Sequence, residues 1–249
     1  MKKSLLVVAA MFAAVCANAQ GSWTNTVADG LEKDAVAFAA GTVLTEQVPG
    51  MTIKLAGATD WAVKGLDPET FTGADGITYS KNYIQGGTNG TSTGLMHSSG
   101  ESSHIQFTVE KAGTVYVAAK FGNNKPIWAA KVATAEVEEL DISDMSAYLY
   151  TYEGKYIKDD GTYGGDEAAT EAQYAALPLA VEPGYTYFFW VSGSKLMLSG
   201  INFTTGASGI STVKAAAEAE GTIYNIAGQK VAADYKGLVI KNGKKFIQK

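Results

Sequence analysis

The two histidines of the chain, His97 and His104, flank a serine-rich run at 98–103 that also carries Glu101. A serine hydrolase needs a nucleophile held by a base that a carboxylate orients, and no nucleophile-elbow pattern surrounds these serines. Two histidines also fall short of the three or four ligands of a zinc site. We expect polar loop and strand-edge histidines here. A weak glycan-active hydrolase stays a minor alternative, which requires one histidine to meet a serine and a carboxylate in a cleft.

Four acidic residues lie in a glycine-containing loop between positions 159 and 167, namely Asp159, Asp160, Asp166 and Glu167. Calcium prefers carboxylate and carbonyl oxygens, so the loop would suit a structural calcium ion, although its spacing differs from that of an EF-hand. A solvated acidic loop is the simpler interpretation. No other cofactor is indicated by the sequence.

Aromatic residues in polar surroundings are the better lead to a ligand. The candidates, which lie near predicted loops, are Trp128, Tyr150, Tyr152, Tyr156 and Tyr163. Sugar rings stack on exposed aromatic faces while neighbouring polar groups bind their hydroxyls. The alternative for each candidate is ordinary half-buried packing, and Trp61 and Trp190 are expected in the core.

The elements that must position these residues are strands. The segment 184–205 alternates apolar side chains on both faces, which predicts two antiparallel strands joined by a turn at Ser192–Ser194. A change of phase near Ser199-Gly200 predicts a β-bulge. A second hairpin is expected at 105–119, and another strand at 127–132.

Shorter runs at 42–44 and 51–55 are also expected to form strands, separated by a Pro49-Gly50 turn. The Ala/Glu-rich segment 167–176 favours one or two helical turns. Frequent turns and two-residue periodicity predict an all-β fold, a jelly-roll-like β-sandwich over residues 20–207. A low-complexity linker at 208–220 then leads to a small C-terminal β unit at 221–249, with strands at 222–226, 238–240 and 245–247.

Composition narrows the class of partner. The chain of 249 residues carries a formal charge of −5 and contains no arginine, so every strongly basic residue is a lysine. The absence of arginine argues against nucleic-acid readout. Polyanions are also unfavoured, apart from local lysine patches or calcium bridging.

The first 19 residues have the pattern of a signal peptide. Lys2 and Lys3 precede a short apolar core, and Ala17-Asn18-Ala19 forms an A-x-A cleavage site. Cys16 also allows a lipoprotein interpretation, but Val15 before it is a poor lipobox residue. With A-x-A cleavage the mature chain has no cysteine, and no later segment is long and apolar enough to cross a membrane. We expect export to the extracellular space or outer cell surface, or to the periplasm.

The tail carries the run Tyr224-Asn225-Ile226-Ala227-Gly228-Gln229-Lys230-Val231, then Lys236-Gly237-Leu238-Val239-Ile240 and a lysine-rich close. It resembles the C-terminal end of the type IX secretion sorting domain of Bacteroidetes. The match covers the tail alone, whereas the family domain is longer. The resemblance implies sorting to the cell surface, or surface retention by a shorter relative of that domain.

Residues 75–205 resemble, more loosely, the β-sandwich accessory domains of secreted Bacteroidetes glycan-processing proteins. The shared features are the Gly-Gly-Thr-Asn-Gly loop at 86–90, the 105–121 hairpin and the Gly-Ser-Lys-Leu segment at 193–196. Such domains are similar in form to carbohydrate-binding modules. The resemblance implies a noncatalytic protein that binds a polysaccharide or other glycan. The alternative is a structural or adhesive surface protein with a protein partner, which an apolar patch would favour.

Overall fold

The computed structural model describes residues 22–24, 32–165, 167–205, 223–225, 230–231, 237–241 and 244–248. The chain divides into two compact units, Met1–Gly206 and Ala207–Lys249. Within the described residues, no helix has the length and apolar character needed to span a membrane. The predicted signal peptide and the predicted linker at 208–220 lie outside the described residues.

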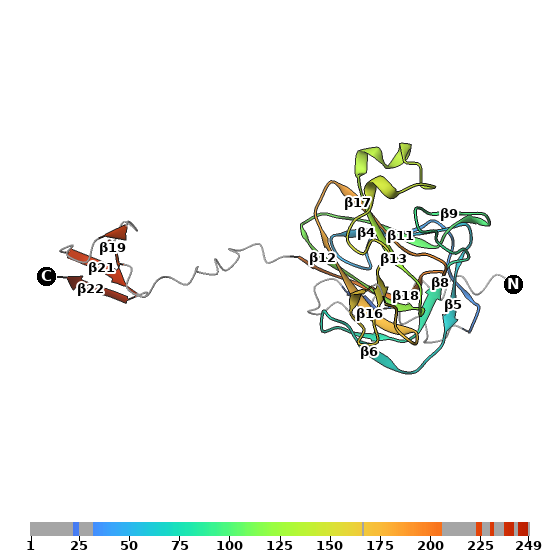
Figure 1. The fold of residues 1–249 in the computed structure, drawn as a ribbon, viewed down its shortest axis with the longest axis horizontal. Helices are drawn as coiled ribbons and strands as arrows, with labels where there is room; N and C mark the ends of the chain where they lie inside the picture. Colours follow the sequence, from blue (N-terminus) through green and yellow to red (C-terminus); the bar gives the residue numbers. More distant parts are fainter. Residues whose placement is uncertain are drawn as a thin grey trace. The chain divides into compact units, whose positions relative to one another are not determined.

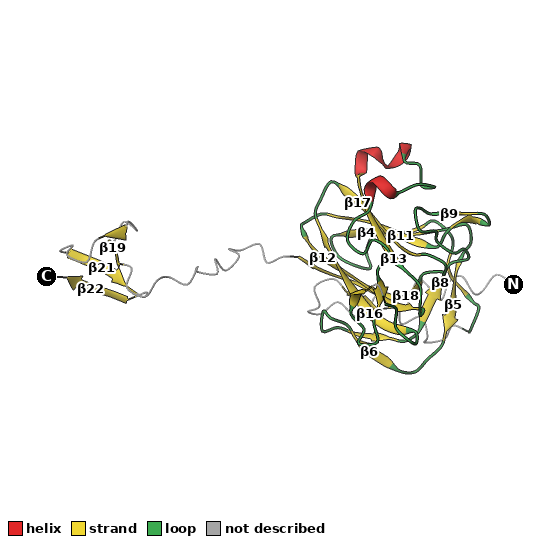
Figure 2. Cartoon of the chain, viewed as in Figure 1, coloured by secondary structure: helices red, strands yellow, loops and turns green. Residues whose placement is uncertain are grey.

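The first unit is built on two antiparallel sheets (Figures 1 and 2). The larger sheet has the order β16-β12-β18-β8-β5-β2, with β1 also paired to β18. Its strands are β1 (Ser22–Thr24), β2 (Val36–Phe38), β5 (Trp61–Gly65), β8 (Tyr83–Gln85), β12 (Gly113–Phe121), β16 (Gln173–Val181) and β18 (Met197–Thr205). The smaller sheet has the order β13-β17-β11-β4-β3. Its strands are β3 (Thr42–Leu44), β4 (Met51–Ala56), β11 (His104–Val109), β13 (Ile127–Ala133) and β17 (Tyr185–Val191).

Several short elements lie outside the two main sheets. Three two-stranded ribbons are formed by β6 (Thr70–Thr72) with β7 (Thr78–Ser80), β9 (Met96–His97) with β10 (Gly100–Glu101), and β14 (Tyr156–Ile157) with β15 (Tyr163–Gly165). Two 3-10 helices, η1 (Thr134–Glu139) and η2 (Ser146–Tyr148), are drawn in red in Figure 2. Residues from their segment pack on the outer side of β13 and β17.

The core lies between the two sheets. Alternate residues of β12 and β16 enter it from the larger sheet, and alternate residues of β17 enter it from the smaller one. Phe121 of β12 meets Phe189 of β17 edge-on, with ring centroids 6.4 Å apart. Both tryptophans that were expected in the core, Trp61 and Trp190, are fully buried. The predicted all-β sandwich is therefore confirmed.

Strand connectivity gives the sandwich its jelly-roll-like character. The strands β11, β12, β13, β16, β17 and β18 alternate between the two sheets along the chain. The two predicted hairpins are therefore wrong, because β17 pairs with β11 and β13 while β18 pairs with β12 and β8. Ser192–Leu196 carries the chain from one sheet to the other, a gap of about 10 Å between stacked sheets. A turn-like sequence fixes the reversal of direction but not which sheet the next strand joins.

Two local expectations have opposite outcomes. The bulge is confirmed, because Ala118 pairs with Gly200 and Ala119 with Leu198, which leaves Ser199 as the extra residue. The helical turns expected at 167–176 are wrong. The strand β16 begins at Gln173, because alternate apolar residues from Ala175 onward fill the core and outweigh the helix propensity of alanine.

The second unit contains one four-stranded antiparallel sheet of order β20-β19-β21-β22. Its strands are β19 (Ile223–Asn225), β20 (Lys230–Val231), β21 (Gly237–Lys241) and β22 (Lys244–Gln248). The three strands expected in the tail match β19, β21 and β22 to within a residue or two. The sequence reading missed the two-residue strand β20.

Candidate ligand-binding surface

The segment 149–155, which carries two of the predicted ligand-binding tyrosines, closes the edge of the sandwich. It runs antiparallel to β13, with bridges from Leu149 to Ala130 and from Lys155 to Ile127. The Tyr150 amide donates to the Ala129 carbonyl at 2.8 Å. Backbone pairing along the free edge of β13 therefore determines where the side chains of this segment lie.

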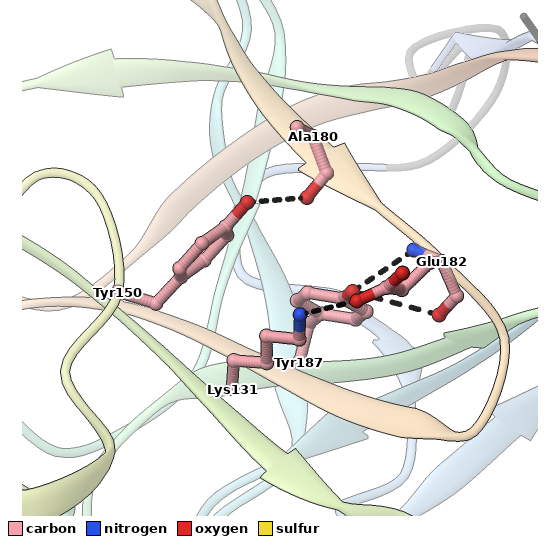
Figure 3. Close-up of polar contacts among 5 residues, drawn as sticks. All are labelled: Lys131, Tyr150, Ala180, Glu182 and Tyr187. Atoms are coloured by element: carbon pink, nitrogen blue, oxygen red, sulfur yellow. Dashed lines mark hydrogen bonds and ion pairs between the residues drawn. The ribbon is translucent and has the colours of Figure 1, made fainter.

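Both tyrosine hydroxyls of this segment reach the edge strand of the other sheet. Tyr150 donates to the carbonyl oxygen of Ala180 at 2.9 Å, and Tyr152 donates to that of Pro178 at 2.5 Å. Figure 3 shows the first of these bonds beside the Lys131–Glu182 ion pair. The two tyrosines thus link β13 of one sheet to β16 of the other.

Tyr152 is too deeply buried to bind a ligand in the way that the sequence suggested. It is 2% exposed, and its ring meets Phe189 and Tyr163 edge-on at centroid distances of 5.7 and 4.4 Å. Burial raises the pKa of its hydroxyl far above the usual value, so the group is a neutral donor. Tyr163 is half-buried against this ring. A sugar could reach Tyr152 only if the edge segment opened.

Trp128 lies on the opposite, outer face of β13. Its ring stacks on Trp190 at 6.3 Å with 14° between the planes, and its Nε1 donates to Ser192 Oγ at 2.9 Å. Tyr156 is half-buried in the β14–β15 ribbon. The five predicted aromatic residues therefore do not line one exposed groove, because their strands direct them to different faces.

The acidic loop is only partly described, since Asp166 lies outside the described residues. Asp159 accepts hydrogen bonds from the backbone and hydroxyl of Thr170, and Asp160 accepts the equivalent pair from Thr162. The bonds from Thr162 hold the pKa of Asp160 below its usual value. Among the described residues, no three acidic, histidine or cysteine side chains gather as metal ligands would. A calcium ion at this loop stays a prediction.

The two histidines occupy different environments. His97 is exposed, and its Nδ1 lies 2.8 Å from Ser99 Oγ. His104 is fully buried, donates from Nδ1 to the Ser102 carbonyl and accepts at Nε2 from Gln106. Burial lowers the pKa of His104 to about 4, so the ring is neutral and its 3.8 Å approach to Glu101 is not an ion pair at neutral pH. Within the described contacts, neither ring has both a serine hydroxyl and a carboxylate in hydrogen-bond reach.

Another group of aromatic and basic side chains lies on the outer face of the larger sheet. Gln85 pairs with Met197, Met197 with Lys120, and Lys120 with Tyr174, across β8, β18, β12 and β16. These four residues, with Tyr83 of β8 added, form what we call the Lys120 row. Paired residues on adjacent strands share a face, so the row crosses about 14 Å of sheet.

Two half-buried tyrosines flank the lysine of this row. Lys120 Nζ lies 5.5 Å from the ring centroid of Tyr174 and 5.7 Å from that of Tyr83, which is cation–π range. The Tyr83 ring also covers Gly65, where a Cβ atom would come within 2.4 Å of ring carbons. Glycine on β5 therefore gives this ring room to lie over the sheet.

The β6–β7 ribbon supports Tyr174 from one side. Phe71 of β6 lies 5.3 Å from the Tyr174 ring and 5.5 Å from the buried Tyr79 ring. Asp75, in the turn of the ribbon, accepts hydrogen bonds from the Tyr79 hydroxyl at 2.6 Å and from Asn202 of β18 at 2.8 Å. The bond from Tyr79 lies within the ribbon, and the bond from Asn202 attaches the ribbon to the larger sheet.

Charges around the row are mixed. Lys81 forms an ion pair with Glu69 and lies 5.6 Å from the Tyr174 ring. Burial, then the neighbouring Tyr83 and the carboxylates of Asp67 and Glu69, raise the pKa of Tyr174 to about 12. Its hydroxyl is therefore neutral and able to donate a hydrogen bond at neutral pH.

Sequence reasoning missed this row. Tyr174 fell in the segment expected to be helical, and Lys120 and Tyr83 lie on strands that no local pattern places beside each other. The pattern that could have indicated the row is the two-residue alternation of β12 and β16, which directs Lys120 and Tyr174 away from the core. The chain matches no protein-family model and no curated protein sequence, so the row must be judged on its chemistry.

Proposed function

We propose that this protein is a noncatalytic glycan-binding β-sandwich, exported to the outer cell surface or the extracellular space. The observation that carries the proposal is the pair of half-buried rings, Tyr83 and Tyr174, on one sheet face on either side of Lys120. Pyranose rings stack on such faces, and amine, amide and phenol groups bind the hydroxyls around them. The signal-peptide pattern supports export.

We place the proposed site at the Lys120 row and not at the aromatic residues that the sequence favoured. Tyr150 and Tyr152 use their hydroxyls on the β16 carbonyls. Trp128 uses one ring face on Trp190 and its Nε1 on Ser192. Tyr83 and Tyr174, in contrast, have no hydrogen bond from their hydroxyls among the described contacts, which leaves both phenols available for a sugar.

The test is affinity electrophoresis of the purified protein through gels that contain single polysaccharides, both neutral and charged. We expect retardation by at least one polymer. The double variant Tyr83→Ala/Tyr174→Ala should lose it, while Tyr83→Phe/Tyr174→Phe should keep most of it because the stacking faces remain. Circular dichroism and thermal unfolding of each variant check that the fold is retained.

Tyr156→Ala is the matched control, since Tyr156 is half-buried in the separate β14–β15 ribbon and was itself a sequence candidate. Retardation that vanishes in this variant and survives in the double variant would move the site back to the predicted aromatic set. A folded protein that no polysaccharide retards would refute glycan binding.

One observation favours a second function, adhesion through a protein partner. Val36 and Val43 are 54% and 53% exposed, and they lie on β2 and β3, each of which is the last strand at one end of its sheet. An exposed strand edge can pair with a strand of another protein. Replacing both valines with lysine should abolish such pairing, measured by crosslinking on intact cells, and leave glycan retardation unchanged.

A further inference from the structure

Among the described residues of the first unit, three lysines lie against tyrosine rings, and they differ in how their charge is balanced. Lys131 is 4.0 Å from the Tyr185 ring centroid and forms an ion pair with Glu182. Lys81 lies over Tyr174 and forms an ion pair with Glu69. Lys120 lies between Tyr174 and Tyr83, and among the described residues no carboxylate oxygen lies within 4.0 Å of its ammonium group.

The position of Lys120 makes this difference relevant to a ligand. Its residue lies in the middle of the Lys120 row, between Met197 on one neighbouring strand and Tyr174 on the other. Its side chain is half-buried, so its stem is packed while its ammonium group lies between two rings. A ligand that stacks on either tyrosine thus brings its substituents next to a cation without a partner carboxylate.

The chemistry of that cation selects a class of sugar. A neutral pyranose would offer Lys120 only uncharged hydroxyl and ether oxygens, whereas a uronic acid offers a carboxylate on the same ring that stacks on tyrosine. Charge-assisted hydrogen bonds are about twice as strong as neutral ones, and a partly desolvated ammonium group gains most from an anion. The nearby Asp67 and Glu69 carboxylates can in turn accept hydrogen bonds from sugar hydroxyls.

We propose that the Lys120 row binds a polysaccharide containing uronic acid, with a pyranose ring stacked on Tyr83 or Tyr174 and its carboxylate paired with Lys120. This inference rests on the proposed function, because it names the substrate class of the same surface. It also reconciles an acidic protein with an anionic ligand, since the attraction is confined to one lysine in an aromatic setting. Binding of this kind weakens as salt screens the charge pair.

The test compares polyuronates with the same polymers after reduction of their carboxyl groups, which leaves the backbone linkages unchanged. Polygalacturonate and alginate serve as probes, and isothermal titration calorimetry measures affinity at low and high salt. We expect native polymer to bind at least about tenfold more tightly than reduced polymer, and the advantage to shrink at high salt.

Lys120→Met should remove about that tenfold preference and leave weak binding of the reduced polymer unchanged, because the hydrophobic stem and both rings remain. Lys120→Arg should retain the preference. Lys54→Met is the matched control, since Lys54 is an exposed lysine on β4 of the other sheet. It makes the same change in charge away from the row.

Two results would overturn the inference. One is Lys120→Met binding native polyuronate as tightly as wild type, and the other is reduced polymer binding as tightly as native polymer. In either case glycan binding itself would stand, provided that Tyr83→Ala/Tyr174→Ala still abolished it. Failure of every charged and neutral polymer to bind would instead remove both the inference and the proposed function.

Discussion

The hydroxyl of Tyr150 donates a hydrogen bond of 2.9 Å to the carbonyl oxygen of Ala180. Tyr150 lies in the segment that pairs with β13 of one sheet, and Ala180 lies in β16, the edge strand of the other sheet. Tyr152 repeats the contact two residues later, on Pro178. The two bonds use carbonyl groups that a sheet edge would otherwise leave to solvent. A tyrosine-rich stretch that looked like a sugar-binding surface in the sequence is thus part of the closure of the sandwich.

This closure predicts a difference between two conservative substitutions. Tyr152→Phe should destabilise the protein by about 1 to 2 kcal/mol, because its bond lies in a largely buried setting and its loss leaves the Pro178 carbonyl unpaired. Tyr150→Phe should cost less, about 0.5 to 1 kcal/mol, since water can replace its exposed bond. Urea unfolding measures both, with Tyr156→Phe as control. Equal effects of all three substitutions would argue against the closure.

The sequence predicted where the strands lie better than how they pair. Alternation in 105–119 and 185–203 located the strands, and the phase change at Ser199-Gly200 located the bulge, because these signals are local. Pairing partners are set by contacts far apart in the chain. Residues Ile105 and Phe189 become neighbours only when β11 and β17 pair in the smaller sheet, and no local turn signal encodes that pairing.

The candidate site was likewise set by long-range strand pairing, which local sequence signals do not reveal. Tyr150, Tyr152 and Trp128 were selected because polar residues surround them in the sequence, yet backbone pairing with β13 and stacking on Trp190 place them on different faces. The Lys120 row draws on four strands that are distant in the sequence, β8, β12, β16 and β18. It was missed because its residues are ordinary outward positions of separate strands until the sheet order is known.

Asp75 should couple stability to ligand binding through the β6–β7 ribbon. Asp75→Ala removes the partner of the buried Tyr79 hydroxyl and of Asn202, which we expect to cost about 2 to 3 kcal/mol. Release of the ribbon should also free Phe71 from Tyr174 and so weaken glycan binding in protein that remains folded. Thermal unfolding and calorimetry measure the two effects.

The control is Asp60→Ala, which removes an exposed carboxylate that accepts a bond from the Ala40 amide elsewhere in the unit. It should change neither glycan affinity nor the mobility of the β6–β7 ribbon in hydrogen exchange. If Asp75→Ala leaves exchange in residues 70–80 unchanged, then Asp75 does not hold the ribbon in place.

His104 should make stability depend on pH in a defined window. Its pKa is lowered from 6.5 to about 4 by burial, so the unfolded chain binds a proton more readily than the folded one. The folded state keeps this stability above pH 6.5 and loses it progressively as the pH falls towards 4, by about 3 kcal/mol in all. Chemical unfolding at steps between pH 4 and 7 measures the loss.

His104→Gln should flatten that part of the profile relative to wild type, although the variant is less stable at neutral pH because the stack on Phe188 is lost. His97→Gln should retain the wild-type slope, since His97 is exposed. Parallel profiles for wild type and His104→Gln across this window would show that the slope has another source, such as the carboxylates.

Gly154 and Gly161 allow steric contact with Trp128 to be separated from backbone strain. Both residues have positive φ, +80° and +76°, so alanine at either position costs about 1 kcal/mol for the left-handed conformation. At Gly154 a Cβ atom would also lie 2.7 Å from the Trp128 ring, whereas at Gly161 the nearest atom is 4.0 Å away. Gly154→Ala should therefore be more destabilising than Gly161→Ala, by about 1 to 3 kcal/mol. It should also alter the near-ultraviolet circular dichroism of the Trp128–Trp190 stack, and identical unfolding curves for the two variants would mean that the ring moves aside without cost.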